Sequence, residues 1–317
     1  MMYRLLFLVL IIQLNCAAPQ QQQQRQKVER QPLARSEAVF KTPTQYEKRV
    51  LRVDPKTNEP IYYDPRPQVV VIDAKAGKYA LKWIGYDGKE KVIDYQRADA
   101  IDAIVSASVS KTSDNRYLYT YRIENLPSSA TYLAGFAVQN FAAVLEPRET
   151  DGIFVGQMSS FIPQFSKGNW IRYAVLPDSM SRTMPGRNIE FQLTSPAPPG
   201  LIECRIHGGE STLKGVGEHI PTELENAMPG YDEWPKGYTI GPVDSMKTLP
   251  PAERAQYLLD RLPQFQKLGW MTIEARQRYE GELQRHNLNA VFERAEQDLT
   301  AEQITTEVFD LLQAIKQ

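Results

Sequence analysis

Apolar positions between residues 68 and about 210 follow the two-residue period of β-strands. Serines alternate with Val105, Ala107 and Val109, and every second residue from Tyr117 to Ile123 is aromatic or aliphatic. Alternation of this kind places one face of each strand against a core. About nine short strands with turn residues between them, and no helical period among them, predict an antiparallel, mainly β sandwich.

Single residues and short runs within residues 68–210 predict particular turns, strands and core positions. Asp87-Gly88 stands between two apolar runs and predicts a tight hairpin. The β-branched run Val69–Ile72 predicts a buried strand. We expect Trp170 in the core, and Gly186 in a turn with positive φ.

From residue 251 onward the apolar period becomes helical. Pro250 and Pro251 precede the first helix, a position that proline favours. Pro263 is expected to interrupt this helix, and Gly269 to end whatever follows. Thr272 predicts the start of a second helix, which extends to about Arg285.

Two more helices complete the predicted C-terminal module. A third covers about residues 288–297, and Thr300 with Gln303 three positions later has the capping-box pattern that starts a fourth. The expected apolar side of the second helix includes Ile273. The fourth helix has one apolar stripe, formed by Ile304, Val308, Leu311, Leu312 and Ile315.

The first eighteen residues have the three parts of a secretory signal peptide. Arg4 is followed by the apolar run Leu5–Ile12 and by the small residues Cys16–Ala18. Eight apolar residues are too few to span a bilayer, which needs about 20. We therefore expect an exported protein, periplasmic, cell-surface or extracellular, without a transmembrane segment in the mature chain. Cys16 leaves lipoprotein anchoring open, although the residues before it depart from the usual lipoprotein pattern at two positions.

Composition divides the chain into five predicted segments. Residues 1–18 form the signal peptide, and 19–45 a disordered, Gln-rich linker. Residues 46–210 form the β-sandwich domain. Residues 211–250 are a Gly/Pro-rich connector packed on the sandwich, and 251–317 the helical module.

Charge and cysteine content narrow the class of protein. The formal net charge of -1 lacks the basic excess that nucleic-acid binding needs, so no nucleic-acid partner is expected. Cys204 is the single cysteine after the signal peptide and cannot form an internal disulfide. We expect it to be a small buried residue on a strand, with a reactive or intermolecular role as the alternative.

The candidate binding residues gather in and beside the Gly/Pro-rich connector. They are His207, His219, Tyr231, Asp232 and Trp234. Tyrosine and tryptophan can stack on a sugar ring or anchor a peptide, and both are enriched at interfaces. The alternative is that these aromatic side chains fix the connector onto the sandwich.

No catalytic, metal or cofactor-binding residue is predicted. The chain has no His-Glu-x-x-His helix, no Gly-x-Gly-x-x-Gly after a strand, no Walker loop and no EF-hand loop. His207-Gly208-Gly209 lacks the Gly-x-Ser-x-Gly elbow that would make it an esterase loop. Acids in the connector, among them Glu218 and Glu233, leave a secreted hydrolase open as an alternative.

Three stretches together resemble a known group of proteins. They are Trp83–Lys91 (WIGYDGKEK), Tyr119–Ser129 (YTYRIENLPSS) continued by Gly135-Phe136, and Trp170 followed by Met184-Pro185-Gly186, Phe191, Thr194-Ser195 and Pro199-Gly200. They resemble secreted bacterial proteins of unknown function with an Ig-like β-sandwich followed by a small helical segment. The resemblance covers about 68–210 and, more loosely, the C-terminal helices. It implies an antiparallel Ig-like β-sandwich with a separate C-terminal α-helical module, and it transfers no functional residue.

The sequence thus predicts an exported, non-enzymatic binding or scaffolding protein of the cell envelope or extracellular space. Its expected partner is an envelope protein or a polysaccharide. A carbohydrate- or peptide-binding module that uses Tyr231 and Trp234 is one alternative, and a secreted hydrolase is another.

Overall fold

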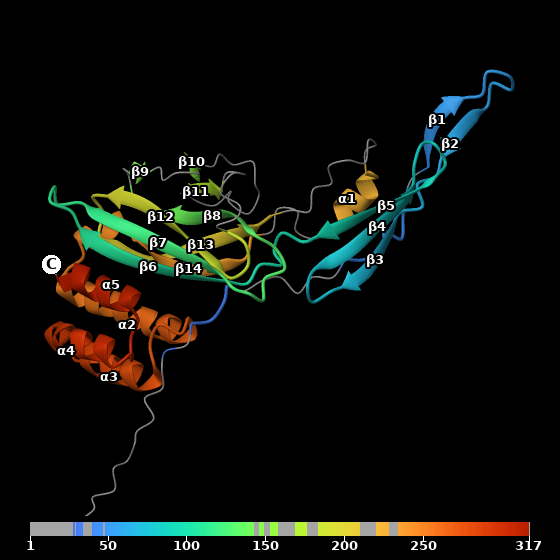
Figure 1. Cartoon of the computed structure of the whole chain (residues 1–317). Helices are drawn as coiled ribbons and strands as arrows, with labels where there is room; N and C mark the ends of the chain where they lie inside the picture. The colour runs from blue at the N-terminus through green and yellow to red at the C-terminus, as the bar shows by residue number, and fades with distance from the viewer. Residues whose placement is uncertain are drawn as a thin grey trace, which may run out of the picture.

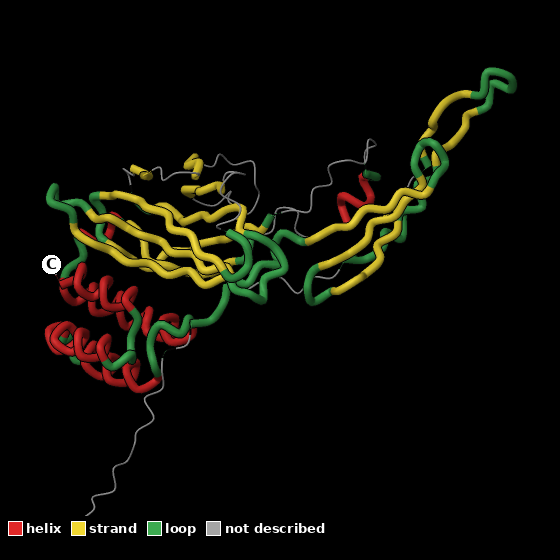
Figure 2. Tube along the Cα trace, in the orientation of Figure 1, coloured by secondary structure: helices red, strands yellow, loops and turns green. Residues whose placement is uncertain are grey.

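The computed structural model describes residues 28, 30–33, 40–46, 48–142, 146–148, 153–157, 169–175, 183–209, 220–227 and 234–316. These residues form a two-sheet sandwich, a helical segment packed against it and a long arm of strands that extends away from it (Figure 1). Figure 2 shows the same division, with the C-terminal helices gathered on one side of the sandwich. The predicted fold class, mainly β with antiparallel sheets and C-terminal helices, is confirmed.

The sandwich consists of two antiparallel sheets. The order in the first is β6 (Ala103–Lys111), β7 (Tyr117–Asn125), β12 (Arg187–Ser195) and β9 (Glu146–Arg148). The order in the second is β10 (Ile153–Gln157), β11 (Asn169–Val175), β8 (Leu133–Asn140), β13 (Pro199–Gly208) and β14 (Lys236–Pro242).

This strand order is that of the immunoglobulin fold. β6 and β7 form a hairpin, β8 crosses to the opposite sheet, and β12 returns to pair with β7. β13 then pairs with β8, and β14 pairs with the other side of β13. In immunoglobulin nomenclature the sheets correspond to A-B-E-D and C-F-G, with the β10–β11 hairpin added beside strand C.

The sandwich core lies between these sheets, as the alternation predicts. Tyr119, Tyr121 and Ile123 are fully buried. Across the sheets, ring centroids are 5.3 Å apart for Tyr121 and Phe136, and 5.5 Å apart for Phe136 and Phe191. Contacts at these distances add to the free energy gained by burial. Cys204 is also fully buried, which confirms its predicted place on a strand.

The segment 211–250, predicted as a Gly/Pro-rich connector, contains regular structure: it supplies the edge strand β14 and the short helix α1 (Thr222–Ala227). Runs of glycine and proline are typical of loops. In β14, however, a Cβ on Gly237 would come within 1.9 Å of Leu33 Cδ2, and one on Gly241 within 2.1 Å of Ile202 Cδ1. These glycines therefore allow close approach of neighbouring side chains within a strand.

The first strands also differ from the prediction, which placed them in the sandwich domain 46–210. β1 (Arg49–Val53) pairs with β2 (Pro60–Tyr63), and β3 (Gln68–Asp73), β4 (Lys78–Ile84) and β5 (Glu90–Gln96) form a separate sheet. Together they make the arm. Alternation predicts a covered face for each strand but not which layer covers it.

The three-stranded sheet of the arm has its own small core, which α1 helps to cover. This core consists of Phe40, Tyr79, Leu81, Trp83, Tyr95, Ile220 and Leu224. The predicted Asp87-Gly88 hairpin joins β4 to β5, and Gly88 has a φ of 75°. Glycine adopts a positive φ without strain, so the tight turn forms at Gly88.

The joint between arm and sandwich is buried and hydrogen-bonded. Arg97 and Asp99, in the connection from β5 to β6, form a buried ion pair. Beside them, the Gly208 N–H donates to the Ala98 carbonyl at 3.0 Å. A Cβ on Gly208 would lie 2.3 Å from that carbonyl oxygen, so this close approach requires glycine.

The N-terminal segment is not unstructured throughout, in contrast to the predicted linker 19–45. The Leu33 N–H donates to the Ala103 carbonyl at 3.0 Å, at the free edge of β6. Phe40 is buried in the arm core, where its ring lies 4.3 Å from that of Tyr79. Residues 19–45 contain few apolar side chains, so the sequence did not indicate that Leu33 and Phe40 contact the folded domain.

Four helices form the C-terminal segment, as predicted. They are α2 (Pro251–Lys267), α3 (Ile273–Gln284), α4 (Leu288–Thr300) and α5 (Thr306–Lys316). Thr272 caps α3 by accepting a hydrogen bond from the Ala275 N–H at 3.2 Å. Gly269 follows α2 with a φ of 66°, and the whole predicted stripe of α5 is buried.

Three details of the helical prediction were wrong. Pro263 lies inside α2, because burial of Leu258, Leu262 and Phe265 outweighs a helix-interior proline penalty of about 3 kcal/mol. Thr300 ends α4 instead of starting α5, and its hydroxyl donates to the Glu296 carbonyl at 2.9 Å.

The third error concerns Ile273, which is exposed and not part of the apolar side of α3. It occupies the first turn of that helix, directly after the Thr272 cap. Its place at the helix end leaves it outside the packed face formed by Ala275, Tyr279 and Leu283.

Helix α5 closes one edge of the sandwich. Glu307 and Asp310 accept hydrogen bonds from the backbone N–H groups of Ala107 and Val109 on β6, at 2.8 and 2.7 Å. Arg30 completes this edge by pairing with Glu307 at 2.7 Å. Partial burial raises the pKa of Asp310 from its ordinary 3.8 to about 6. In the described parts of the chain, no helix has both the length and the apolar character needed to cross a bilayer.

Candidate functional site

The structure brings together two of the five predicted binding residues. His207, near the end of β13, stacks on Trp234, which lies two residues before the start of β14, with ring centroids 4.8 Å apart. From β11, the Arg172 guanidinium lies 5.1 Å from the Trp234 ring. The other three predicted residues (His219, Tyr231 and Asp232) lie outside the described residues, as do the acids Glu218 and Glu233.

Burial limits what this pair can bind. Trp234 is only 4% exposed and His207 only 7% exposed. The indole packs on β8 so closely that a Cβ on Gly135 would lie 2.9 Å from Trp234 Cη2. The Trp234 ring therefore fixes its segment onto the sheet, and neither ring face is free to stack on a sugar.

Trp170 belongs to the same outer face of the five-stranded sheet. It is buried, but with Ala137 and Trp234 in a cluster separate from the sandwich core where we expected it. The Arg205 guanidinium lies 5.4 Å from its ring and pairs with Glu203 at 2.7 Å. This face is thus a packed layer of aromatic and charged side chains.

The described residues also limit the catalytic chemistry. Within them, no group of three or more His, Cys, Asp and Glu side chains is placed to hold a metal ion. Burial raises the pKa of the Cys204 thiol well above its usual value, so this thiol stays protonated. A protonated, buried thiol is a poor nucleophile.

The arm presents a different kind of surface, with many exposed apolar side chains. Among the described residues, thirteen large apolar side chains are exposed, and ten of them belong to the arm or its flanks. The ten are Tyr46, Val50, Leu51, Val53, Tyr62, Val70, Val71, Ile72, Tyr86 and Val92. The remaining three (Phe141, Met184 and Ile273) are scattered over the sandwich and helices. Clustered apolar exposure of this kind is typical of interaction surfaces.

Strand register concentrates part of this surface on one face of the β1–β2 hairpin. Val50 lies opposite Tyr62, and Val53 lies opposite Pro60. Val50 and Val53 are three positions apart, so a regular strand would place them on opposite faces, but a bulge at Leu51 brings them to the same face. All four residues on this face are exposed, and an isolated two-stranded hairpin is marginal in water.

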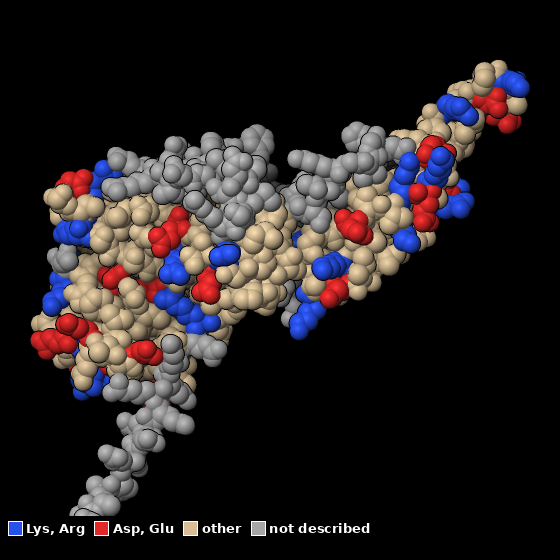
Figure 3. Space-filling model, viewed as in Figure 1, with Lys and Arg blue, Asp and Glu red and all other residues tan. Residues whose placement is uncertain are grey.

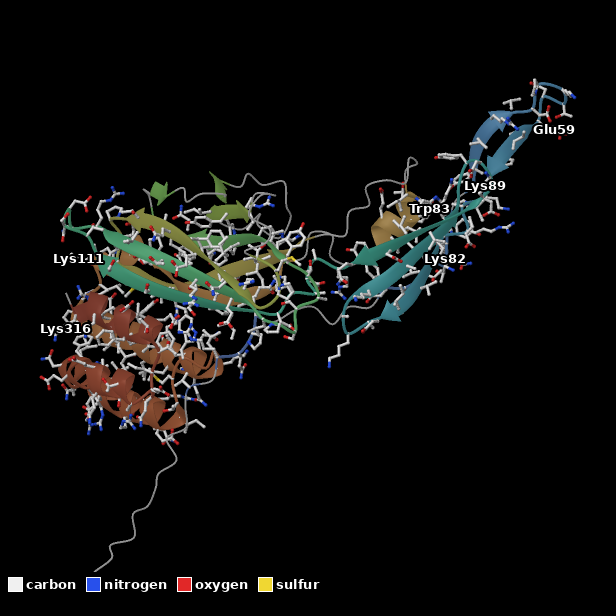
Figure 4. All side chains as sticks on the ribbon, viewed as in Figure 1. Glu59, Lys82, Trp83, Lys89, Lys111 and Lys316 are labelled. Carbon is white, nitrogen blue, oxygen red and sulfur yellow. The ribbon has the colours of Figure 1, made fainter. Side chains whose placement is uncertain are left out.

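Charged groups surround the apolar positions without dominating them. Figure 3 shows lysine, arginine and acidic side chains interspersed along the visible side of the arm. In Figure 4, Lys82 and Trp83 on β4 lie on opposite sides of the strand, and Glu59 marks the tip of the hairpin. Trp83 is buried in the arm core, so the Lys82 side is the uncovered face of this sheet.

The predicted buried strand Val69–Ile72 is the clearest correction. β3 is an edge strand, and Val70, Val71 and Ile72 are all exposed. Only Val69 packs against the arm core. A continuous β-branched run is typical of a strand covered on both faces, but here Val70, Val71 and Ile72 are exposed, and among the described residues only Thr42 bonds to the outer edge, at Val69.

Sequence reasoning missed the arm as a candidate site. The local patterns between residues 46 and 96 are those of ordinary half-buried strands, and nothing local tells a strand inside a sandwich from one in an arm. One signal in the sequence points to the arm. Val70–Ile72 are three consecutive apolar residues, and the predicted fold contains no apolar segment that would cover both faces of this strand.

No family model and no curated protein match the sequence. Among solved structures, the chain is similar to an uncharacterized protein from Nocardia farcinica with an immunoglobulin-like fold. The identity is 12%, the TM-score is 0.26, and the match covers 42% of this chain and 95% of that one.

A second similar structure is the full-length major pilin SpaD from Corynebacterium diphtheriae. The identity is 9% and the TM-score 0.25, and the match covers 54% of this chain and 55% of the pilin, about half its length. Both likenesses are too distant to carry an argument about function. The strand order itself defines the chain as an Ig-like β-sandwich protein with a C-terminal helical segment.

Proposed function

We propose that this chain is an exported, non-enzymatic binding or scaffolding protein of the cell envelope or extracellular space, and that it docks to a protein partner through its arm. The first eighteen residues support export. The sandwich and helices serve as the rigid base from which the arm extends.

The observation that carries this proposal is the concentration of exposed apolar side chains on the arm. Single exposed apolar residues are ordinary, but ten on one slender element are not. The hairpin face formed by Val50, Val53, Pro60 and Tyr62 offers an aromatic side chain flanked by aliphatic ones. Exposed tyrosines among aliphatic side chains are frequent anchors at protein interfaces.

A site-specific crosslinking experiment tests the proposal in the source cells. A photo-crosslinking amino acid replaces Tyr62 on the hairpin in one variant and Ile273 on α3 in the control variant. Both residues are exposed, at 57% and 53%, so neither change should disturb the fold. We expect a discrete crosslinked protein from position 62 and none from position 273, with the chain in the exported fraction.

Two results would overturn the proposal. One is a chain that stays in the cytoplasm with its first eighteen residues intact. The other is an equal crosslinking pattern from positions 62 and 273, which would show that the arm has no privileged partner.

A further inference from the structure

We propose that a pocket at one end of the sandwich binds a carboxylate that carries a short apolar group, such as a small organic acid or the last residue of a polypeptide. The pocket lies where the β6–β7 turn, the turn between β12 and β13, the start of α2 and the end of α5 meet. Figure 4 shows Lys111, which lines it, at this end of the sandwich, whereas Glu59 marks the distant tip of the arm. The pocket is therefore separate from the docking surface proposed for the arm.

The pocket has a polar part and an apolar part. Lys111, Asn115 and Arg254 form the polar part. A mainly apolar wall with a few placed polar groups is typical of small-molecule sites. The volume is about 220 Å³, below the roughly 300 Å³ at which sites for drug-sized ligands begin, so the ligand must be small. The apolar lining consists of Tyr117, Pro196, Pro198, Met246, Ala314 and Ile315.

The charges of the polar part favour an anion. Lys111 at the end of β6 and Arg254 in the first turn of α2 both line the pocket, and no acidic side chain does so among the described residues. Partial burial raises the pKa of the Tyr117 hydroxyl above its ordinary 10, so this side chain stays neutral at physiological pH. A bound anion would therefore meet two positive charges and no negative charge from these walls.

Arg254 is fixed in place and keeps one nitrogen for a ligand. Its Nε donates to the Leu249 carbonyl and its Nη1 donates to the Ile315 carbonyl, both at 2.8 Å. These bonds hold the guanidinium between the start of α2 and the last turn of α5. Its third nitrogen, Nη2, donates to no described residue. Because the guanidinium is already oriented, it loses little conformational entropy when it binds a carboxylate.

Asn115 supplies a neutral donor on the opposite side of the chain's fold from α2. It lies in the β6–β7 turn with a φ of 64°, a conformation that asparagine adopts more readily than most residues. Its backbone N–H donates to the Thr112 carbonyl at 3.1 Å, which fixes the turn. Its side-chain amide forms no hydrogen bond with a described residue, so both amide N–H groups can donate to a ligand.

The two parts of the pocket together indicate the class of ligand. Inorganic phosphate would use the polar part alone and would leave the apolar walls in contact with water. A carboxylate offers two oxygen atoms to Arg254 and Lys111, and a short alkyl group attached to it can cover the apolar walls. A free organic acid and the terminal residue of a polypeptide share this chemistry, so the test has to distinguish these two sources.

Titration calorimetry of the mature chain measures binding of three probes. They are 3-methylbutanoate, the peptide Ala-Ala-Leu with a free terminal carboxylate, and the same peptide with a terminal amide. We expect both carboxylates to bind with dissociation constants of about 1 mM or lower, and the amide to bind at least about tenfold more weakly because it lacks the charge. A peptide that binds about tenfold more tightly than 3-methylbutanoate identifies a polypeptide terminus as the ligand, and similar affinities identify a free acid.

Lys111→Gln is the main test variant, because Arg254 also joins α2 to α5 and its loss would disturb the fold. Lys111→Gln should weaken binding of both carboxylates about tenfold. The matched control is Lys267→Gln, an exposed lysine at the other end of α2, which should leave binding unchanged. Asn115→Gly keeps the positive φ of the turn and removes only the side-chain amide, so it should weaken binding about threefold.

Nuclear magnetic resonance locates the bound probe. The side-chain amide signals of Asn115 should shift on addition of 3-methylbutanoate, and shifts confined to other parts of the chain would overturn the proposal. It would also be overturned by no binding of either carboxylate at about 10 mM, by equal affinities of the carboxylate and amide peptides, or by equal effects of Lys111→Gln and Lys267→Gln. These results are independent of crosslinking at Tyr62, so this inference and the docking role of the arm can fail separately.

Discussion

The junction between α5 and β6 allows the sharpest stability prediction. Glu307 is completely buried, accepts the Ala107 N–H at 2.8 Å and pairs with Arg30 at 2.7 Å. One carboxylate thus joins three parts of the chain: the N-terminal segment, the sandwich edge and the last helix. Glu307→Ala removes both interactions at once.

The structure sets the size of the effect. A buried N–H left without an acceptor costs about 1–3 kcal/mol, and breaking a buried ion pair costs about 3–5 kcal/mol. Arg30 retains 21% exposure, so water partly solvates its guanidinium once the partner is gone. We therefore expect Glu307→Ala to lower the free energy of unfolding by about 3 kcal/mol. Glu307→Gln keeps an acceptor for Ala107 and should cost about 1–2 kcal/mol.

Urea unfolding of the mature chain, followed by far-UV circular dichroism, measures these differences. Glu293→Ala, on the exposed surface of α4, is the matched control and should stay within about 0.5 kcal/mol of wild type. Combining Arg30→Ala with Glu307→Gln closes a double-mutant cycle, in which we expect coupling of about 1 kcal/mol or more. Two results would contradict the described contacts of Glu307. One is a double-mutant cycle in which the losses of unfolding free energy simply add, and the other is a loss below about 1 kcal/mol for Glu307→Ala.

Three further outcomes follow from other positions. Because the folded chain holds the Asp310 proton more tightly than the unfolded chain, this group stabilises the fold below pH 4 and that contribution is lost as pH rises through 6. Partial exposure reduces an upper limit of about 3 kcal/mol to about 1–2 kcal/mol. Asp310→Asn should therefore gain that amount relative to wild type between pH 4 and 7 in urea titrations, and parallel pH profiles would contradict this. Gly186 has a φ of 81°, and a Cβ there would meet Pro127 Cγ at an ordinary contact distance of 3.9 Å, so Gly186→Ala should cost about 1 kcal/mol in backbone strain; an unchanged melting temperature would argue against that turn. Trp170→Ala should cost about 3–5 kcal/mol despite its place outside the sandwich core, because Trp234 and Ala137 pack against it; a loss below 1 kcal/mol would show a loosely held ring.

Local chemistry was enough to predict part of the fold. The alternation through Tyr119 and Tyr121, the Asp87-Gly88 hairpin, the Thr272 cap and the stripe of α5 all depend on neighbours within a few residues, and the structure confirms each. The contacts of the predicted binding residues depend on distant parts of the chain. His207 and Trp234 do meet, but their burial depends on Gly135 from a distant strand. The binding roles of His219, Tyr231 and Asp232 stay predictions.

By itself the sequence determined the fold class and the succession of a β-region followed by four helices, because periodicity and turn chemistry act over short stretches of chain. The export signal stays a prediction. Tertiary structure decided which strands share a sheet and which edges remain open. Val69–Ile72 shows the reason: strand propensity is local, but burial depends on whether a distant segment covers the strand. Here the edge of β6 received α5 and the N-terminal segment, whereas most of the edge of β3 received no covering segment among the described residues.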